Sequence, residues 1–305
     1  MFSLFKTPES GKDEGINRRH TREPVHAAAG GAQESQALTG AALRSPASGR
    51  LKLGFVGLAA GSGATTLSFA AAEYLAALLA DRNGRARTGS RKSERTVTML
   101  ELDLRPQAPE GWPYDKIGID RRFAGRDYIS LYRLAAEGLP LHGVRNIDGG
   151  IGWALRVPGE SVPTLSVVAL HRLLSNVPGD IVVCDIPAHG ILGGAEKRPD
   201  RDALLALLAD LDHLICVFDP LPSRLLASVP AAEICRAAAA SGVPVTNVFN
   251  KMSDGVNLRE ATRFTGVKDY LPFPAVPAEA VYAAEYACRS LAPELKPSLA
   301  RLVPD

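Results

Sequence analysis

A glycine-rich turn with two adjacent threonines lies between an apolar run and a helical run. Residues 57–68 read GLAAGSGATTLS, directly after the apolar run 51–56 and directly before the helical run 69–79. Glycines let successive N–H groups turn inward around an anion, and the following helix adds its positive end. In such loops a hydroxyl after the lysine position binds Mg²⁺, and here that residue is Thr65. The pattern predicts a phosphate-binding loop formed by Gly61, Ser62, Gly63, Ala64, Thr65 and Thr66.

This loop contains no lysine. Ala64 stands where a phosphate-binding lysine would stand, between Gly63 and the threonine pair. Taken alone, the sequence GSGATT is also compatible with a glycine turn that only lets a strand and a helix pack closely. Motifs further along the chain are needed to decide between the two interpretations.

Carboxylates end two later apolar runs. Glu101 and Asp103 close the strand expected over 96–102, and alternate residues of a strand point to the same side. We expect one of them to orient an attacking water and the other to assist with the metal or the loop; the alternative is a strand end that caps the next turn. Asp185 ends the run 180–185, DIVVCD, which is typical of the strand whose aspartate holds the metal through water.

Two further segments are suited to a nucleotide base. Asn250 ends the strand expected over 243–250, and its amide offers a donor and an acceptor that fit an adenine edge. Residues 271–274, LPFP, precede a helix and form a loop type that can pack over a base through Pro272. The predicted ligands are therefore a nucleotide and Mg²⁺, with Thr65 and Asp185 at the metal.

Strands and helices alternate along most of the chain. Strands are expected over 51–56, 96–102, 152–157, 180–185, 213–218 and 243–250, and helices over 65–79, 127–137, 164–175, 201–211, 223–241 and 278–290. Continuous apolar strands separated by helices predict an α/β fold with a doubly wound, mostly parallel sheet and helices on both faces. Ligands of such sheets bind beyond the carboxyl ends of the strands, where each motif above lies.

The expected domain begins near residue 51. Residues 1–50 are rich in Gly, Ala, Ser, Pro and mixed charge without periodicity, which predicts a disordered tail or linker, and 51–305 then form the nucleotide-binding domain. Two long loops are expected inside it, a basic one over 81–95 and another over 106–126. The basic loop is either an exposed, solvated loop or a contact to phosphates; the role of either loop is not given by the residues.

Composition narrows the class of protein. The net charge of +2 points neither to a nucleic-acid binder nor to an acidic scaffold. The cysteines, Cys184, Cys216, Cys235 and Cys288, lie far apart, so we expect reduced core thiols of a cytoplasmic protein. No apolar run reaches the roughly 20 residues of a membrane span.

The ordered set of motifs resembles the MinD/ParA family of P-loop ATPases over residues 51–303. The family's loop, K-G-G-x-G-K-[ST]-[ST], falls on 59–66, and its Asn-Lys base motif falls on 250–251. The resemblance implies a P-loop fold that binds ATP and Mg²⁺, and a homodimer bridged by ATP that recruits an assembly partner. It assigns catalytic roles to Asp103 and Glu101.

Both family lysines are replaced, the phosphate-binding one by Ala64 and the dimer-crossing one by Ala59. A hydrogen bond from a charged group is worth about 1.5–3 kcal/mol, whereas a cation on the transferring phosphate is worth about 10³–10⁵ in rate. The replacements therefore argue against brisk hydrolysis more strongly than against binding. Within the family, the loop 61–66 is similar to that of the CpaE/TadZ proteins, which help to position pilus-assembly machinery; those proteins usually carry a receiver-like domain ahead of the ATPase.

Three functions are compatible with these observations. The first is a degenerate ATP-binding protein that acts as a nucleotide-dependent switch in localisation or assembly, in the cytoplasm or at the inner membrane through a partner. The second is a working ParA-like ATPase that contacts DNA or a membrane, for which no helix-turn-helix pattern or aromatic interleaving is present. The third is a scaffold that has lost its nucleotide.

Overall fold

The computed structural model describes residues 49–85, 96–102, 112–160, 167–187 and 201–302. All of them belong to the second of two compact units, Leu38–Asp305. The predicted tail lies outside the described residues except for its last two positions. Asp103 and the predicted loop residues 86–95 also lie outside them.

An eight-stranded sheet forms the centre of the described part of the chain. Its strands are β1 Leu51–Gly57, β2 Val97–Glu101, β3 Ile147–Asp148, β4 Ile151–Ala154, β5 Ile181–Ile186, β6 His213–Phe218, β7 Val245–Met252 and β8 Leu271–Pro274. They are ordered β3-β4-β2-β5-β1-β6-β7-β8. Every neighbouring pair is parallel except β3 and β4, which are antiparallel. Strand β1 therefore lies between β5 and β6, with all three carboxyl ends at one edge.

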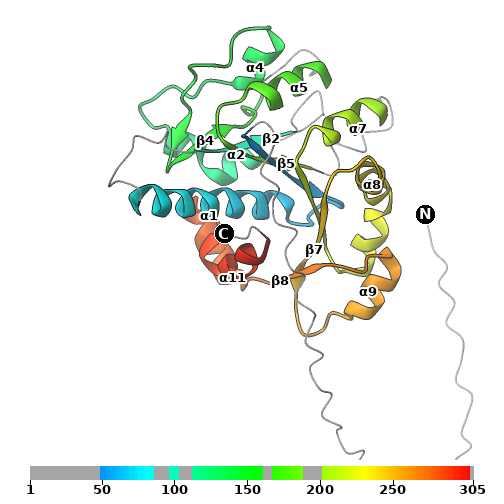
Figure 1. Ribbon diagram of the computed structural model, residues 1–305. Coiled ribbons are helices and arrows are strands. Elements are labelled where there is room, and N and C mark those ends of the chain that lie inside the picture. The colour runs from blue at the N-terminus through cyan, green and yellow to red at the C-terminus, as the bar shows by residue number, and fades with distance from the viewer. Residues whose placement is uncertain (1–48, 86–95, 103–111, 161–166, 188–200, 303–305) are drawn as a thin grey trace, which may run out of the picture. The chain divides into compact units, whose positions relative to one another are not determined.

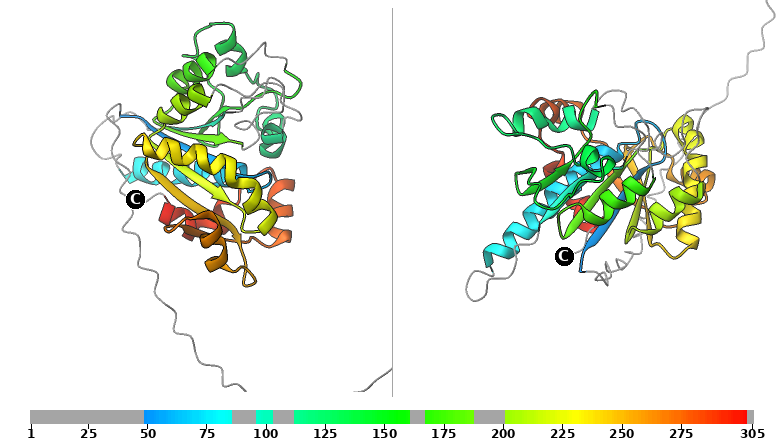
Figure 2. Two further views of the ribbon diagram at one scale, coloured as in Figure 1. Left: turned by 90° about the vertical axis from the view of Figure 1, so that its right-hand side faces the viewer. Right: turned by 90° about the horizontal axis from the view of Figure 1, so that it is seen from above.

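Helices cover both faces of this sheet. They are α1 Ala64–Arg85, α2 Trp112–Ile117, α3 Ile119–Arg122, α4 Leu131–Ala136, α5 Val167–Asn176, α7 Arg201–Ala209, α8 Pro222–Ala240, α9 Leu258–Thr265, α10 Ala278–Tyr286 and α11 Ala292–Leu302. Helices α1 and α11 lie together on one face, and α7 and α8 lie on the other (Figure 1). Seen from above, the cyan helix α1 and the yellow helix α8 lie on opposite sides of the blue strand β1 (Figure 2).

Alternate strand residues supply two separate cores. Phe55 of β1 and Val183 of β5 pack against α1 and α11 on one face. Val56 of β1 and Cys184 of β5 pack against α5, α7 and α8 on the other. Because successive strand residues point to opposite faces, a strand must be apolar throughout to fill both cores. The predicted doubly wound α/β fold is confirmed.

Several element predictions were wrong in ways that packing explains. The interval 106–126, predicted as a loop, contains α2 and α3, whose Tyr114, Ile117 and Ile119 join the core beside α1. Helix α1 continues to Arg85, past the start of the predicted basic loop. Residues 271–274 form strand β8, paired with β7, instead of a loop. In each case contacts with distant elements outweigh a weak local signal.

Proline did not interrupt two helices. Helix α8 runs without a break through Pro230. Its buried residues recur at helical spacing, with Leu225, Ala232 and Cys235 among them, so the tertiary contacts offset the lost hydrogen bond. Helix α11 likewise contains Pro297 and buries three leucines against α1.

The cysteines agree with the predicted reduced state. All four are free thiols; Cys184, Cys216 and Cys235 are buried and Cys288 is partly buried. Burial raises the pKa of the Cys184 thiol, which keeps it protonated at neutral pH. Within the described residues, we find no helix that combines the length and the apolar character needed to span a membrane.

Candidate functional site

The predicted phosphate loop connects the end of β1 to the start of α1. Gly61 and Gly63 adopt left-handed backbone conformations, with φ of 71° and 91°, which glycine reaches without a steric cost. The backbone N–H of Ser62 donates to the carbonyl of Ala59 at 3.1 Å, and the N–H of Leu67 donates to the carbonyl of Gly63 at 2.9 Å. The loop is thus a tight turn that leads directly into the first turn of α1.

Asn250 fixes the middle of this loop from β7. Its Nδ2 donates to the backbone carbonyl of Ser62 at 2.9 Å. A Cβ atom on Gly63 would lie 2.3 Å from the same Nδ2, so no larger residue fits there without movement. The predicted adenine-binding amide therefore directs its donor to the loop and is 7% exposed.

Lys251, the next residue, reaches the same loop. Its ammonium donates to the carbonyl of Gly61 and lies 2.9 Å from Oδ2 of the buried Asp219, at the end of β6. Consecutive strand residues normally point to opposite faces. Here the pairing of β7 with β8 is irregular between Phe249 and Met252, and Lys251 has a φ of 58°. This bulge lets two adjacent side chains hold one loop.

The two predicted metal ligands lie side by side. The hydroxyl of Thr65, in the first turn of α1, donates to Oδ2 of Asp185 at 2.7 Å. Asp185 is 1% exposed and lies near the end of β5, next to β1 in the sheet. A hydroxyl and a carboxylate thus meet at the positive end of a helix, 120 residues apart in sequence.

Glu101 lies beside Asp185 in the register of β2 and β5. It is 3% exposed, and its Oε2 accepts a hydrogen bond of 3.0 Å from the backbone N–H of Arg156. This carboxylate holds the segment that follows β4. Strand β2 ends at Glu101, and its expected companion Asp103 lies outside the described residues.

The two alanines in the lysine positions are buried. Ala64 is 5% exposed and packs in the core beside α1, and Ala59 is 6% exposed. Between them, Ala60 and Gly61 are exposed. A methyl group, without charge or hydrogen-bonding capacity, therefore occupies each position at which the resemblance would place an ammonium group.

Pro272 is not in a loop. It lies in β8, where it pairs with Phe249 of β7, and it is partly buried. Its neighbour Phe273 is fully buried in the core beside α1. The segment 271–274 is thus an edge of the described sheet, next to the strand that carries Asn250.

A further lysine approaches the threonine pair from α2. The ammonium of Lys116 donates to Oγ1 of Thr66 at 2.9 Å. It also lies 3.1 Å from Oε1 of Glu285 on α10. This lysine joins α1, α2 and α10 at the beginning of α1.

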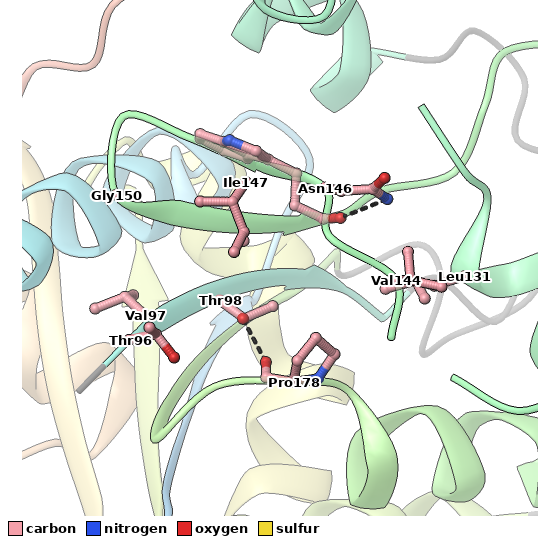
Figure 3. A pocket seen from close by; sticks show the side chains of 11 residues that line it. Thr96, Val97, Thr98, Leu131, Val144, Asn146, Ile147, Gly150 and Pro178 are labelled. Carbon is pink, nitrogen blue, oxygen red and sulfur yellow. Dashed lines mark hydrogen bonds between the residues drawn. The ribbon is translucent and has the colours of Figure 1, made fainter. Parts of the chain in front are cut away.

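A separate small pocket lies at the opposite edge of the sheet (Figure 3). Its lining includes Thr98 of β2, Gly152 of β4, Asn146 and Ile147 at the start of β3, and Pro178 ahead of β5. The hydroxyl of Thr98 donates to the carbonyl of Pro178 across it. Because the strands are parallel, this pocket is distant from the loop at their carboxyl ends.

Solved structures with similar architecture include ParA and MinD proteins. A ParA family ATPase from Chlorobium tepidum superposes with a TM-score of 0.58 at 14% identity, covering 83% of this chain and 98% of that one. The septum site-determining protein MinD of Pyrococcus horikoshii, complexed with Mg-ADP, gives 0.56 at 16% identity, with coverages of 84% and 96%. A putative plasmid partition protein of Borrelia burgdorferi bound to AMPPNP gives a TM-score of 0.54 at 12% identity, covering 83% of this chain and 98% of that one.

The chain has the fold of ParA and MinD ATPases. No protein-family model and no curated protein matches the sequence. At sequence identities of 12–16% the likeness establishes only the ParA/MinD fold. What this chain binds or catalyses has to be argued from its own residues.

Within this ParA/MinD fold, the sequence analysis did not identify Asp219, Lys116 and Glu285 near the loop, and it placed Lys251 only in the expected base motif. Asp219 follows β6 directly, so its position at the carboxyl end of a strand was a usable signal. Lys251 follows Asn250, but strand alternation would have pointed it away. Lys116 and Glu285 gave no signal, because both lie on helices whose placement depends on contacts with α1.

Proposed function

We propose that this chain is an ATP-binding protein of the MinD/ParA type that works as a nucleotide-dependent switch in localisation or assembly. Residues 51–305 form its nucleotide-binding domain in this proposal. The observation that carries it is the 2.7 Å contact between Thr65 and Asp185 at the end of a glycine loop. A turn built only for close packing has no need of a hydroxyl–carboxylate pair at a helix N-terminus.

The residues at this point fit Mg²⁺. This ion prefers oxygen ligands, keeps several waters and takes others from substrate phosphates. Thr65 would hold it through Oγ1 and Asp185 would hold it through a water, with both oxygens already adjacent. When bound, the ion would neutralise charge on the phosphates. The bound Mg-ADP and AMPPNP of the two similar structures support this choice of ligand.

We further propose that hydrolysis is weak or absent. Backbone N–H groups and Mg²⁺ can bind a triphosphate, but rapid transfer needs a cation on the charge that develops in the transition state. Ala64 and Ala59 provide only methyl groups at the two positions concerned. Glu101 and Asp103 keep their assigned catalytic roles in this proposal, and their contribution would be limited by the missing charge.

The switch would act through a homodimer and an assembly partner. Helix α8 begins beside the loop, since a Cβ on Gly61 would lie 4.0 Å from Nη2 of Arg224. Three apolar side chains near this end are exposed, Leu221 by 58%, Leu226 by 66% and Val229 by 38%. Apolar residues exposed beside a ligand site favour a protein contact there. Such a partner would bring the protein to the inner membrane.

Calorimetric titration with ATP tests the ligand. We expect heat of binding for the full chain, and tighter binding with Mg²⁺ than with a chelator. Asp185→Asn and Thr65→Ala should lose the magnesium-dependent part. Thr262→Ala is the matched control, because its hydroxyl bonds to the carbonyl of Arg259 within α9. The proposal is overturned if millimolar ATP gives no heat, which would leave a scaffold without nucleotide.

Light scattering tests the switch. We expect the mass of the particle to double with ATP and Mg²⁺ and to remain that of the monomer with ADP. A monomer at every ATP concentration, despite measured ATP binding, would contradict the dimer and retain the binding site. Release of phosphate at rates typical of active ATPases would contradict the proposed loss of hydrolysis.

A further inference from the structure

Lys116 places a positive charge against the phosphate loop. Its side chain is only 10% exposed. The ammonium donates to Oγ1 of Thr66, the second residue of the predicted hydroxyl pair, at 2.9 Å. Lys116 lies on α2. This helix is not part of the strand, loop and helix that make up a P-loop motif.

The position of this ammonium is electrostatically unusual. The first turn of α1 carries the positive end of the helix dipole, where a cation is disfavoured. A largely buried lysine at that point is stable only with an anion close by. In the described part of the chain, Glu285 at 3.1 Å is such an anion. It is 43% exposed and lies on the outer helix α10, so water screens its charge.

Thr66 links the ammonium to the loop. Its Oγ1 accepts from Lys116, and a hydroxyl that accepts one bond still has its own hydrogen to donate. An oxygen that accepted that hydrogen would lie about 2.7 Å from Oγ1. The same oxygen would then lie at most about 6 Å from Nζ. This maximum is the sum of the distance from Nζ to Oγ1 and the distance from Oγ1 to the oxygen. A phosphate bound by the loop through Thr66 would therefore lie close enough to Lys116 to be attracted by its charge.

We propose that Lys116 is a phosphate-binding cation of this site, supplied from α2; it would strengthen nucleotide binding, while the charge that Ala64 and Ala59 leave missing at the transferring phosphate stays missing. The inference rests on the proposed function. A nucleotide phosphate bound by the loop would compete with Glu285, which lies 3.1 Å from the ammonium. Lys251 does not serve this role, because its ammonium is held by the Gly61 carbonyl and by Asp219, which is 3% exposed.

Three lysine variants test the role of the charge. Titration with ATP and with inorganic triphosphate, both with Mg²⁺, should show about tenfold to a hundredfold weaker binding for Lys116→Met, the loss of one charged hydrogen bond. Lys116→Arg keeps the charge and should lose less. Lys296→Met removes an exposed lysine of α11 and should bind as the unchanged protein does. Equal ATP affinity of Lys116→Met and the unchanged protein would overturn the inference.

Glu285→Gln separates a phosphate-binding role from a structural one. If Lys116 only ties α2 to α10, removing either partner should weaken ATP binding in the same direction. If it binds phosphate, Glu285→Gln removes a carboxylate that competes for the ammonium and should leave ATP affinity unchanged or make it several-fold tighter. Weaker binding in Glu285→Gln overturns the inference even if Lys116→Met fails to fold, as judged by circular dichroism.

The outcome also separates the inference from the proposed function. Absence of ATP binding in the unchanged protein overturns both. Magnesium-dependent ATP binding that is insensitive to Lys116→Met overturns only the inference and leaves the nucleotide site in place.

Discussion

Asn250 donates a hydrogen bond of 2.9 Å to the backbone carbonyl of Ser62, a residue 188 positions earlier in the chain. The bond ties the end of β7 to the turn after β1, two strands away in the sheet. Because the amide is 7% exposed, water cannot readily replace it. The shape of the loop is thus held by a residue of a distant strand as well as by its own glycines.

Replacing Gly63 with alanine should destabilise the fold. The new Cβ would lie 2.3 Å from Nδ2 of Asn250, and the residue would keep a φ of 91°. The left-handed conformation alone costs about 1–2 kcal/mol for a non-glycine residue, and the clash adds to it. We expect the free energy of unfolding in urea to fall by more than that amount.

Gly242→Ala is the control for this variant. Gly242 has a similar φ of 97°, and nothing lies within 4 Å of its would-be Cβ. It should therefore show only the conformational cost. The double variant Gly63→Ala/Asn250→Ala should be less destabilised than the sum of its single changes, because the clash is gone. Strict additivity would contradict the close approach.

Ala64→Lys should strengthen nucleotide binding. The added ammonium restores a charged hydrogen bond to phosphate, worth about 1.5–3 kcal/mol. Calorimetry should show ATP binding about tenfold to a hundredfold tighter, and phosphate release should appear if the remaining machinery is intact. Ala60→Lys adds the same charge at an exposed position of the loop and should change affinity little. If both variants bind ATP equally more tightly, the gain comes from the added net charge and not from a lysine at position 64.

Lys251→Met should destabilise the protein. The variant leaves the carboxylate of Asp219, which is 3% exposed, without the ammonium now 2.9 Å away. Loss of a charged hydrogen bond costs about 1–3 kcal/mol, which should appear as a lower midpoint in urea denaturation. Lys268→Met, at an exposed position after α9, should leave the midpoint unchanged. An unchanged midpoint in Lys251→Met would show that the lysine does not hold the loop.

His213 should make stability depend on pH. It lies at the start of β6, 2.8 Å from Oγ1 of Thr246, and burial lowers its pKa. The unfolded chain takes up a proton near pH 6.5, while the folded chain resists it until a lower pH. The free energy of unfolding should therefore fall below about pH 6.5, by at most about 1.4 kcal/mol per pH unit, and level off below the folded pKa.

Urea denaturation at several pH values between 7.5 and 5 measures this slope. His213→Gln should flatten it, because glutamine does not titrate. His142→Gln, at an exposed position, should leave it as it is. A slope that persists in His213→Gln would assign the proton uptake to another group.

The sequence by itself determined the fold class and the order of the motifs. Apolar runs such as 181–184, which come directly before Asp185, carry no polar break, as expected of a strand that is covered on both faces. The glycine spacing at 61–63 and the acid at the end of β5 are local properties of short segments. The sequence therefore predicted that the glycine turn follows β1 and that the acid lies near the end of β5.

Only the tertiary structure decided how those segments meet. The bulge that turns Asn250 and Lys251 to the same loop depends on the pairing of β7 with β8. The approach of Lys116 to Thr66 depends on α2 packing into the core beside α1. The physical reason is that these contacts join residues 50 to 190 positions apart, and local sequence does not encode such distances. They exist because the two cores bring the elements together.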